Sequence, residues 1–230
     1  MNFNGFQKLT LLDFPGKVAC TLFLAGCNFR CPFCHNASLV TDIDTSISYS
    51  DEEILKYLKK RVGILEGVCI TGGEPLLNSD LEGFLVKVKE LGYPVKLDTN
   101  GYFPKKLKNL IDKKLVDYVA MDIKSCQDKY AFTVGVENLD ISPILESVSL
   151  LKSDVVDYEF RTTIVRELHT IDDITKMGQW VKGAKRHFLQ NFVDSGNLIQ
   201  SGLSEIDKDT LEKMREILSN FVTNAEIRGI

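Results

Sequence analysis

Strand-like and helix-like segments alternate along this 230-residue chain, and that alternation restricts its fold more than any other feature. Short apolar, β-branched segments are each followed by a stretch in which apolar residues recur at helical spacing. The expected strands cover residues 6–12, 18–24, 67–71, 95–97, 118–121, 158–165 and 188–192, with a last extended piece at 223–227. The expected helices start near residues 50, 80, 104, 141, 172 and 208. Strands separated in this way form βαβ units, which predict an α/β fold with a parallel sheet.

The number of units and the helix starts refine this expectation. Ser50 and Glu53 have capping-box spacing, and the apolar stripe behind them runs to Val62. Asp172 is expected to cap the helix that starts beside it. Six βα units are fewer than the eight that close a barrel, so we expect an open, partial (β/α)6 TIM-like barrel. No low-complexity linker divides the chain, and we expect one domain over residues 1–230.

Composition excludes several classes of protein. Hydrophobic residues make up 44% of the chain and charged residues 26%, as in ordinary soluble globular proteins. A net charge of −4 argues against binding of nucleic acid through bulk electrostatics. No apolar run is long enough to span a membrane, and no segment reads as a secretory signal. The six cysteines do not form a disulfide pattern, and they indicate a reducing cytoplasm.

Three of the cysteines lie together in the loop after the strand expected at residues 18–24. Cys27, Cys31 and Cys34 have the spacing C-x3-C-x2-C. Soft thiolates gathered this closely select zinc, copper or an iron–sulfur cluster over harder cations. A [4Fe–4S] cluster held by three thiolates keeps one iron without a protein ligand, and that iron can bind a small molecule. The loop therefore predicts a cluster with an open iron.

Simpler interpretations of the loop stay open at this point. Cys31 and Cys34 enclose a proline and an aromatic residue, as in thiol–disulfide or electron-transfer proteins with a C-P-aromatic-C pair. A structural zinc site is a further alternative, but it needs four ligands and the sequence offers no good fourth one. A redox pair of this kind would not require Cys27.

Polar residues lie at the ends of three of the expected strands, where a βα barrel builds its chemistry, and on a fourth strand. These residues are Gly72, Gly73 and Glu74, then Asp98 and Thr99, then Asp122 and Lys124, and finally Arg161. Paired glycines let the backbone approach a ligand closely, and a glutamate can accept hydrogen bonds from an ammonium group. The alternatives are a plain strand-to-helix turn at the glycines, a solvated Asp–Lys pair, and a structural arginine.

Taken together, these motifs resemble the radical S-adenosylmethionine (SAM) superfamily. The cysteine loop with Phe33 before the last cysteine carries this likeness, together with Gly72-Gly73-Glu74-Pro75. Cys34-His35-Asn36 is similar to the glycyl-radical-enzyme activases within the superfamily. The opening Lys8-Leu9-Thr10-Leu11-Leu12-Asp13-Phe14-Pro15-Gly16 resembles, more narrowly, the activating protein of anaerobic ribonucleoside-triphosphate reductase.

The resemblance implies a role for each of these residues. Cys27, Cys31 and Cys34 would hold a [4Fe–4S] cluster, and Gly72, Gly73 and Glu74 would meet the amine of SAM. Phe33 would pack against the adenine, with Asp98, Thr99 and Asp122 facing the SAM site. Lys124 would bind the SAM carboxylate or the partner's peptide, and Arg161 the carboxylate or a ribose hydroxyl. Asp98, Thr99 and Asp122 could also bind a monovalent cation beside SAM.

The resemblance also implies the reaction and its partners. Reductive cleavage of SAM gives a 5′-deoxyadenosyl radical, which in an activase removes hydrogen from a glycine Cα of a partner enzyme, here anaerobic ribonucleotide reductase. Flavodoxin or ferredoxin would supply the electron. The nearest alternative is a radical SAM enzyme acting on a small molecule, like 7-carboxy-7-deazaguanine synthase. Those enzymes tend to follow the last cysteine with Asp-Thr, whereas His35-Asn36 follows it here.

The remaining cysteines and two histidines receive simple interpretations. Cys20 and Cys69 fall within apolar strands and are expected to be inert core thiols. Cys126 lies in the loop after Lys124, where a role toward the substrate stays open. His169 and His187 are expected at the surface.

Overall fold

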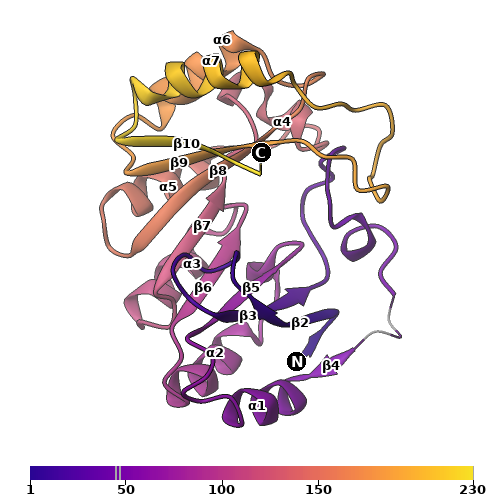
Figure 1. The fold of residues 1–230 in the computed structure, drawn as a ribbon, viewed down its shortest axis with the longest axis vertical. Coiled ribbons are helices and arrows are strands. Elements are labelled where there is room, and N and C mark those ends of the chain that lie inside the picture. Colours follow the sequence, from indigo (N-terminus) through magenta and orange to yellow (C-terminus); the bar gives the residue numbers. More distant parts are fainter. Residues whose placement is uncertain (45, 47, 230) are drawn as a thin grey trace. The chain divides into compact units, whose positions relative to one another are not determined.

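The computed structural model describes residues 1–44, 46 and 48–229, which form two compact units (Figure 1). The N-terminal unit comprises Met1–Asn28, Ser38–Thr99 and Phe103–Ala120. The C-terminal unit comprises Phe29–Ala37, Asn100–Tyr102 and Met121–Ile230.

The N-terminal unit is built on parallel strands with helices after them. Its strands are β1 (Asn2–Phe3), β2 (Gly5–Thr10), β3 (Ala19–Leu24), β4 (Tyr49–Ser50), β5 (Gly67–Gly72) and β6 (Val95–Thr99). Its helices are α1 (Asp51–Lys59), α2 (Leu81–Glu90) and α3 (Pro104–Asp112). β3, β5 and β6 pair in parallel, while β2 pairs antiparallel with β3. The parallel register places Thr21, Cys69 and Lys96 side by side across three strands.

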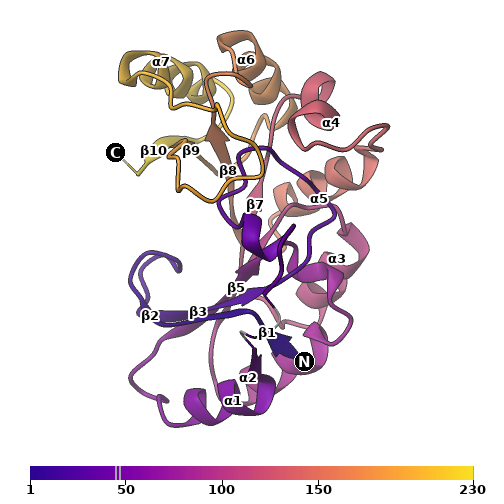
Figure 2. The same cartoon turned by 90° about the vertical axis from the view of Figure 1, so that its right-hand side faces the viewer.

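The C-terminal unit repeats the same alternation. Strand β7 (Tyr118–Asp122) contributes its last two residues to this unit. The elements after it are α4 (Tyr130–Thr133), α5 (Ser142–Lys152), β8 (Asp157–Ile164), α6 (Ile171–Trp180), β9 (Arg186–Asn191), α7 (Lys208–Ser219) and β10 (Asn224–Arg228). β8, β9 and β10 pair in parallel, and α6 lies beside α7 in both views (Figures 1 and 2).

The predicted α/β class and the mostly parallel sheet are confirmed, and two helix details are corrected. Ser50 and Glu53 form the expected capping box, but α1 ends at Lys59, so the predicted stripe does not reach Val62, which is exposed. Helix α6 is capped by Thr170, not by Asp172. The Thr170 hydroxyl accepts from the N–H of residue 173, and the carboxylate there accepts from the Thr170 N–H (2.8 Å). None of the helices in the described part of the chain is long and apolar enough to cross a membrane.

The N-terminal motif contributes to the core of its own unit. Phe14 packs with Ala19, Cys69 and Tyr118, its ring centroid lying 6.1 Å from that of Tyr118. A side chain at Gly67 would meet the Phe14 ring at 2.7 Å, so this strand must begin with glycine. Phe14 therefore seals the unit's core where β3 and β5 begin.

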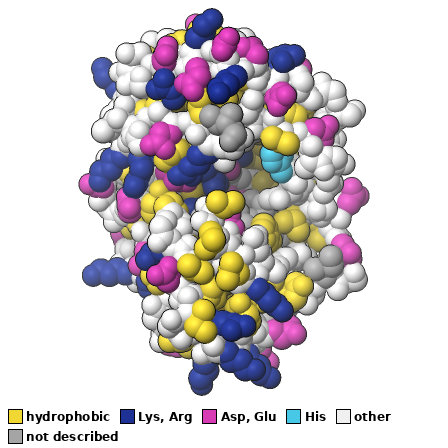
Figure 3. Space-filling view, viewed as in Figure 1, with side chains coloured by type: hydrophobic (Ala, Val, Ile, Leu, Met, Phe, Trp, Pro, Cys, Tyr) yellow, Lys and Arg dark blue, Asp and Glu magenta, His cyan; other side chains and the backbone are white. Residues whose placement is uncertain are grey.

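The leucines of the same motif face outward. Leu9 is 55% exposed, Leu11 67% and Leu12 90%. They are among the apolar side chains that the N-terminal unit leaves at its surface, and Figure 3 shows how such side chains gather on one face. The motif thus combines a buried anchor with an exposed apolar segment.

Two histidines expected at the surface are buried in the C-terminal unit, so that prediction was wrong. His187 is fully buried, and its Nε2 lies 2.8 Å from the Thr162 hydroxyl. Thr162 also lies 2.8 Å from the Ile123 carbonyl, to which it can donate. Burial lowers the pKa of His187 to about 3. The ring is therefore neutral at pH 7.

This burial predicts an acid-dependent loss of stability. Between pH 6.5 and pH 3 the unfolded chain binds a proton at His187 that the folded chain does not, so stability falls as pH falls through 6.5. The His187 contribution at pH 5 should be about 2 kcal/mol less favourable than at pH 8. Urea unfolding of the apoprotein at both pH values measures this loss.

His187→Asn keeps a donor for Thr162 and removes the titrating ring. The difference in unfolding free energy between pH 8 and pH 5 should therefore be smaller in this variant than in the wild type. Equal pH dependence in both proteins would contradict the assignment.

Candidate functional site

The cysteine loop and the glycine turn are bonded to each other through their backbones in the N-terminal unit. The Gly73 N–H donates to the Leu24 carbonyl (2.8 Å), and the Glu74 N–H donates to the Gly26 carbonyl (2.8 Å). Gly26 immediately precedes Cys27. Two motifs that are far apart in the sequence thus form one local structure at the ends of β3 and β5.

Only glycine fits at the two paired positions of this turn. Gly72 has φ +127°, and a Cβ there would lie 2.1 Å from the Leu24 carbonyl oxygen. A Cβ on Gly73 would lie 2.0 Å from the Gly26 carbonyl oxygen and 3.2 Å from the Cys27 Cβ. Because these contacts are with backbone atoms, a side chain would force the two segments apart. The glycines are required for the close approach of the turn to the cysteine loop.

Glu74 is held in a fixed orientation beneath this turn. Its carboxylate is 1% exposed and accepts hydrogen bonds from the Leu76 N–H (2.9 Å) and from the Thr99 hydroxyl (2.9 and 3.0 Å). The bond to Leu76 caps the 3-10 helix Pro75–Leu77, so the structural role of a helix cap is present. The bond to Thr99 joins the end of β5 to the end of β6, which brings together two residues that the sequence assigned to one site.

Asp98, next to Thr99, is paired with a lysine of its own strand. The Lys96 ammonium donates to the Asp98 carboxylate, and both side chains are largely buried. Sequence alone does not single out Lys96, because a lysine in a short strand ordinarily reaches solvent.

In the C-terminal unit, Asp122 joins the other two predicted cations. Its two carboxylate oxygens accept from Lys124 Nζ (3.0 Å) and Arg161 Nε (3.0 Å). Burial disfavours ionisation of Asp122, but Arg161 and Lys124 outweigh burial and lower its pKa to about 2. Burial disfavours the charged form of Lys124 as well, but Asp122 outweighs it and raises the Lys124 pKa above its ordinary value. The three charges form one fixed group.

Phe33 and His169 lie beside this group. The Lys124 ammonium is 5.9 Å from the centre of the Phe33 ring, and the Phe33 and His169 ring centres are 6.4 Å apart. His169 Nδ1 accepts from the Val165 N–H (3.0 Å), so its Nε2 carries the proton and donates to the Lys124 carbonyl (2.8 Å). His169 is 2% exposed, which corrects the expectation of a surface residue. It fixes the backbone at Lys124, and a lone histidine in a predicted loop gave no sign of this.

The rest of the cysteine loop is anchored within the C-terminal unit. Cys31 is buried and Cys34 is partly exposed, and the Cys34 N–H donates to the Cys31 carbonyl (3.1 Å). The carbonyl of Pro32, between them, accepts from the N–H of Gln200 (3.1 Å). Cys27 belongs to the N-terminal unit, and all three cysteines are reduced.

The other three cysteines are buried thiols outside the loop. Cys20 and Cys69 are fully buried, and burial raises the pKa of Cys20 to about 12 and that of Cys69 further. Cys126 is buried and donates to Asp173 (3.5 Å), a carboxylate that also caps α6. The thiol of Cys126 thus contacts the capping box of α6, which is a structural role within the C-terminal unit.

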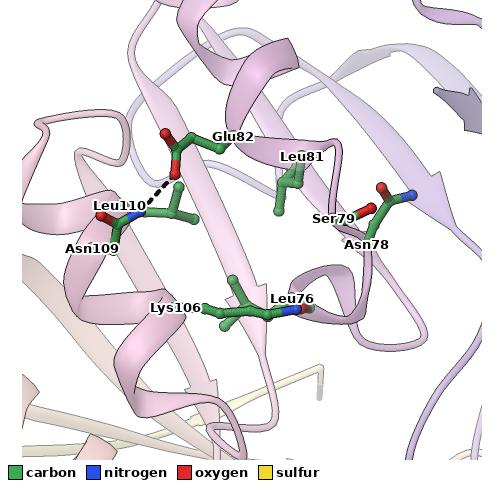
Figure 4. Close-up of a pocket in the computed structure, with 8 residues that line it drawn as sticks. All are labelled: Leu76, Asn78, Ser79, Leu81, Glu82, Lys106, Asn109 and Leu110. Carbon is green, nitrogen blue, oxygen red and sulfur yellow. Dashed lines mark hydrogen bonds between the residues drawn. The ribbon is translucent and has the colours of Figure 1, made fainter.

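A small pocket in the N-terminal unit adjoins the 3-10 helix that Glu74 caps. It has a volume of about 140 Å³ and is lined by Leu76, Asn78, Ser79, Leu81, Glu82, Lys106, Asn109 and Leu110 (Figure 4). Its polar groups bond to neighbours: the Asn109 amide donates to Glu82 (2.6 Å) and the Lys106 ammonium to the Leu76 carbonyl (2.7 Å). The described residues that line it include none that the sequence assigned to SAM or the cluster.

The donor set of the loop fits an iron–sulfur cluster. It consists of three reduced thiols, with no carboxylate inside the loop. In the described part of the chain, no three His, Cys, Asp or Glu side chains stand together as a preformed site for a single ion. At Gly72 and Gly73, the turn presents only backbone atoms to the segment that leads into Cys27. Three thiols with no good fourth ligand suit an iron–sulfur cluster with one open iron better than a four-ligand zinc site.

Comparison with known proteins identifies the family. The Radical SAM superfamily matches residues 21–181. A Methanocaldococcus jannaschii protein, provisionally named a glycyl-radical enzyme activating enzyme, is 32% identical over 233 residues, covering 99% of this chain and 95% of that protein. The pyruvate formate-lyase-activating enzyme of Staphylococcus aureus is 28% identical over 188 residues, covering 76% of this chain and 73% of that one.

A solved structure supports the same fold. Streptococcus suis SuiB bound to S-adenosylmethionine superposes with a TM-score of 0.68 at 14% identity, covering 90% of this chain. This chain spans about half of SuiB, 51% of its length, so the likeness concerns the fold alone. A [4Fe–4S] cluster and SAM are the cofactors that the family implies. This chain is an enzyme and belongs to the radical SAM superfamily.

Proposed function

We propose that this chain installs a glycyl radical on a partner enzyme, and that the partner is anaerobic ribonucleoside-triphosphate reductase. The observation that carries the proposal is the bonding of the Gly73 and Glu74 amides to the strand end and loop that lead into Cys27. Under this proposal the bonding would hold the cluster ligand Cys27 and the SAM-binding turn in one local structure. The names of the M. jannaschii and S. aureus relatives support the activase class.

The residues of the N-terminal unit would bind and orient the amino-acid part of SAM. Gly72 and Gly73 let the ligand approach the backbone, and Glu74, fixed by Thr99, would accept from its ammonium group. Cys27, Cys31 and Cys34 would hold the [4Fe–4S] cluster. When the cluster and SAM are bound, they supply a 5′-deoxyadenosyl radical by reductive cleavage.

The residues of the C-terminal unit would bind the remaining groups. Phe33 offers a ring face to the adenine, and Lys124 and Arg161 offer two cations to a carboxylate or a ribose hydroxyl. Asp122 favours the charged form of Lys124 and orients both cations, and His169 holds the Lys124 backbone. That residues 1–230 form a single catalytic domain stays part of this proposal.

The proposal also includes a setting for the reaction. Flavodoxin or ferredoxin would donate the electron, and the reduced thiols suit a reducing cytoplasm. The hydrogen removed from the partner comes from a glycine Cα, so the partner must present that glycine in an extended segment. Ordering this segment costs entropy, which predicts modest affinity for the isolated peptide.

Electron paramagnetic resonance tests the proposal directly. The protein is reconstituted anaerobically with iron and sulfide, reduced, and mixed with SAM and candidate glycyl-radical enzymes. A glycyl doublet on anaerobic ribonucleotide reductase is expected. A doublet on a different partner would correct the substrate, and turnover of a small molecule with no doublet on any partner would overturn the activase assignment.

A further inference from the structure

Lys96 is a buried cation that the roles described above do not use. It lies on β6 and its side chain is 2% exposed. Its ammonium donates to Asp98, two residues along the strand, and alternate residues of a strand share one face. Asp98 is 16% exposed and sits next to Thr99 at the strand end.

The surroundings of Lys96 make Asp98 its charge partner. The register places Lys96 beside Cys69, and Cys69 beside Thr21. Burial raises the pKa of Cys69 well above its ordinary value, so its thiol is neutral and offers no negative charge. The nearby Asp13 carboxylate accepts from the Thr21 hydroxyl (2.5 Å).

A buried ammonium is stable only when its charge is compensated. Transfer of an unpaired charge into a protein interior costs several kcal/mol or more, and the pair keeps that cost low only while both partners stay in place. A metal cation at Asp98 would bind a carboxylate that is already paired with the Lys96 ammonium. Binding of a metal cation would therefore place two positive charges on the Asp98 carboxylate, or would leave the buried Lys96 ammonium without its charge partner.

We propose that Lys96 is a positioning residue that supplies Asp98 with the positive charge a monovalent cation would otherwise bring, so that SAM binding does not need such a cation. This inference rests on the proposed function, because it assigns Asp98 and Thr99 to the SAM site. It also replaces the expectation of a monovalent cation at Asp98 by a group built into the chain. Because Lys96 is part of strand β6, its positive charge is in place before SAM binds and no ion has to be taken up from solution.

The test is the dependence of SAM affinity on the cation in the buffer. Equilibrium dialysis of oxidised, reconstituted protein measures the dissociation constant in potassium chloride and in choline chloride at equal ionic strength. Wild-type affinity should be the same in both salts. Lys96→Met should bind SAM ~tenfold more weakly in choline, and potassium should restore part of that loss.

Lys113→Met is the matched control. Lys113 pairs with Glu82 in the same unit, at the surface and away from the predicted site residues. Its SAM affinity should equal that of the wild type in both salts. A wild type that loses affinity in choline, or a Lys96→Met protein that binds as the wild type does in both salts, would overturn the proposal.

Unfolding of the apoprotein gives a second measurement that needs neither cluster nor SAM. Lys96→Met should lower the unfolding temperature, and Asp98→Asn added to it should restore part of the loss, because the second change removes the uncompensated carboxylate. Absence of any recovery would contradict the pairing. If the reconstituted wild type binds no SAM in either salt, the proposed function fails, while this apoprotein measurement still judges the Lys96–Asp98 pair.

Discussion

Replacement of Cys27 by alanine is expected to reduce SAM cleavage to background, a loss of ~10³-fold or more. Three thiolates are the minimum that leaves a single open iron on a [4Fe–4S] cluster, and two cannot fix which iron is open. Cys27 also follows Gly26, whose carbonyl accepts from the Glu74 N–H (2.8 Å). The same hydrogen bond therefore positions both the expected cluster ligand and the expected SAM-binding turn. The measurement is the rate of 5′-deoxyadenosine formation by the reduced protein.

Cys20→Ala is the control for this variant. Cys20 is a buried thiol of β3, in the strand that leads to the loop, and its loss should leave SAM cleavage near the wild-type rate. A thiol–disulfide protein using Cys31 and Cys34 would respond differently. Thiol-dependent redox activity that survives in Cys27→Ala, with no SAM cleavage in the wild type, would favour that alternative.

Gly73→Ala is expected to abolish detectable SAM binding while the protein still folds. A Cβ at this position would lie 2.0 Å from the Gly26 carbonyl oxygen, so the turn and the cysteine loop must separate. Separation breaks the Glu74–Gly26 hydrogen bond (2.8 Å) and should also cost about 1–3 kcal/mol of stability. Equilibrium dialysis with SAM and urea unfolding measure the two effects.

Gly83→Ala controls for the general effect of adding a methyl group. Gly83 lies within α2, where an added Cβ meets no atom within 4 Å apart from its chain neighbours and the backbone of its own helix. Alanine is the better helix former by about 0.5–1 kcal/mol, so this variant should be slightly more stable and should bind SAM normally. Tight SAM binding by Gly73→Ala would show that the close approach of turn and loop is not needed.

The sequence predicted those parts of the fold that depend on local patterns. Strand and helix periodicity placed the elements to within a few residues, and Ser50 was recognised as a cap because its partner Glu53 is three residues away. The expected cap of α6 was Asp172, whereas the Thr170 hydroxyl accepts from the N–H of residue 173 and is the observed cap. Local sequence does not discriminate between neighbouring capping residues.

The site was predictable where motif and strand end coincide, and hidden where it depends on packing. Gly72, Gly73 and Glu74 follow a strand directly, and the structure places them against the cysteine loop. The burial of His169 and Lys96 could not be read from the chain, because it is produced by contacts with residues distant in sequence. Charged and imidazole side chains are usually exposed, so a sequence-based prediction places them at the surface. That prediction fails for Lys96, whose charge is compensated by Asp98 in the interior.

The central claim is that three cysteines hold a cluster whose remaining iron binds SAM, and one spectroscopic titration tests it. Protein prepared without oxygen is analysed for metal, reduced, and measured by electron paramagnetic resonance before and after addition of SAM. We expect about four irons per chain, the content of one [4Fe–4S] cluster, and a spectrum that shifts when SAM is added. Bound zinc in place of iron, or a cluster spectrum that SAM leaves unchanged, would contradict the assignment.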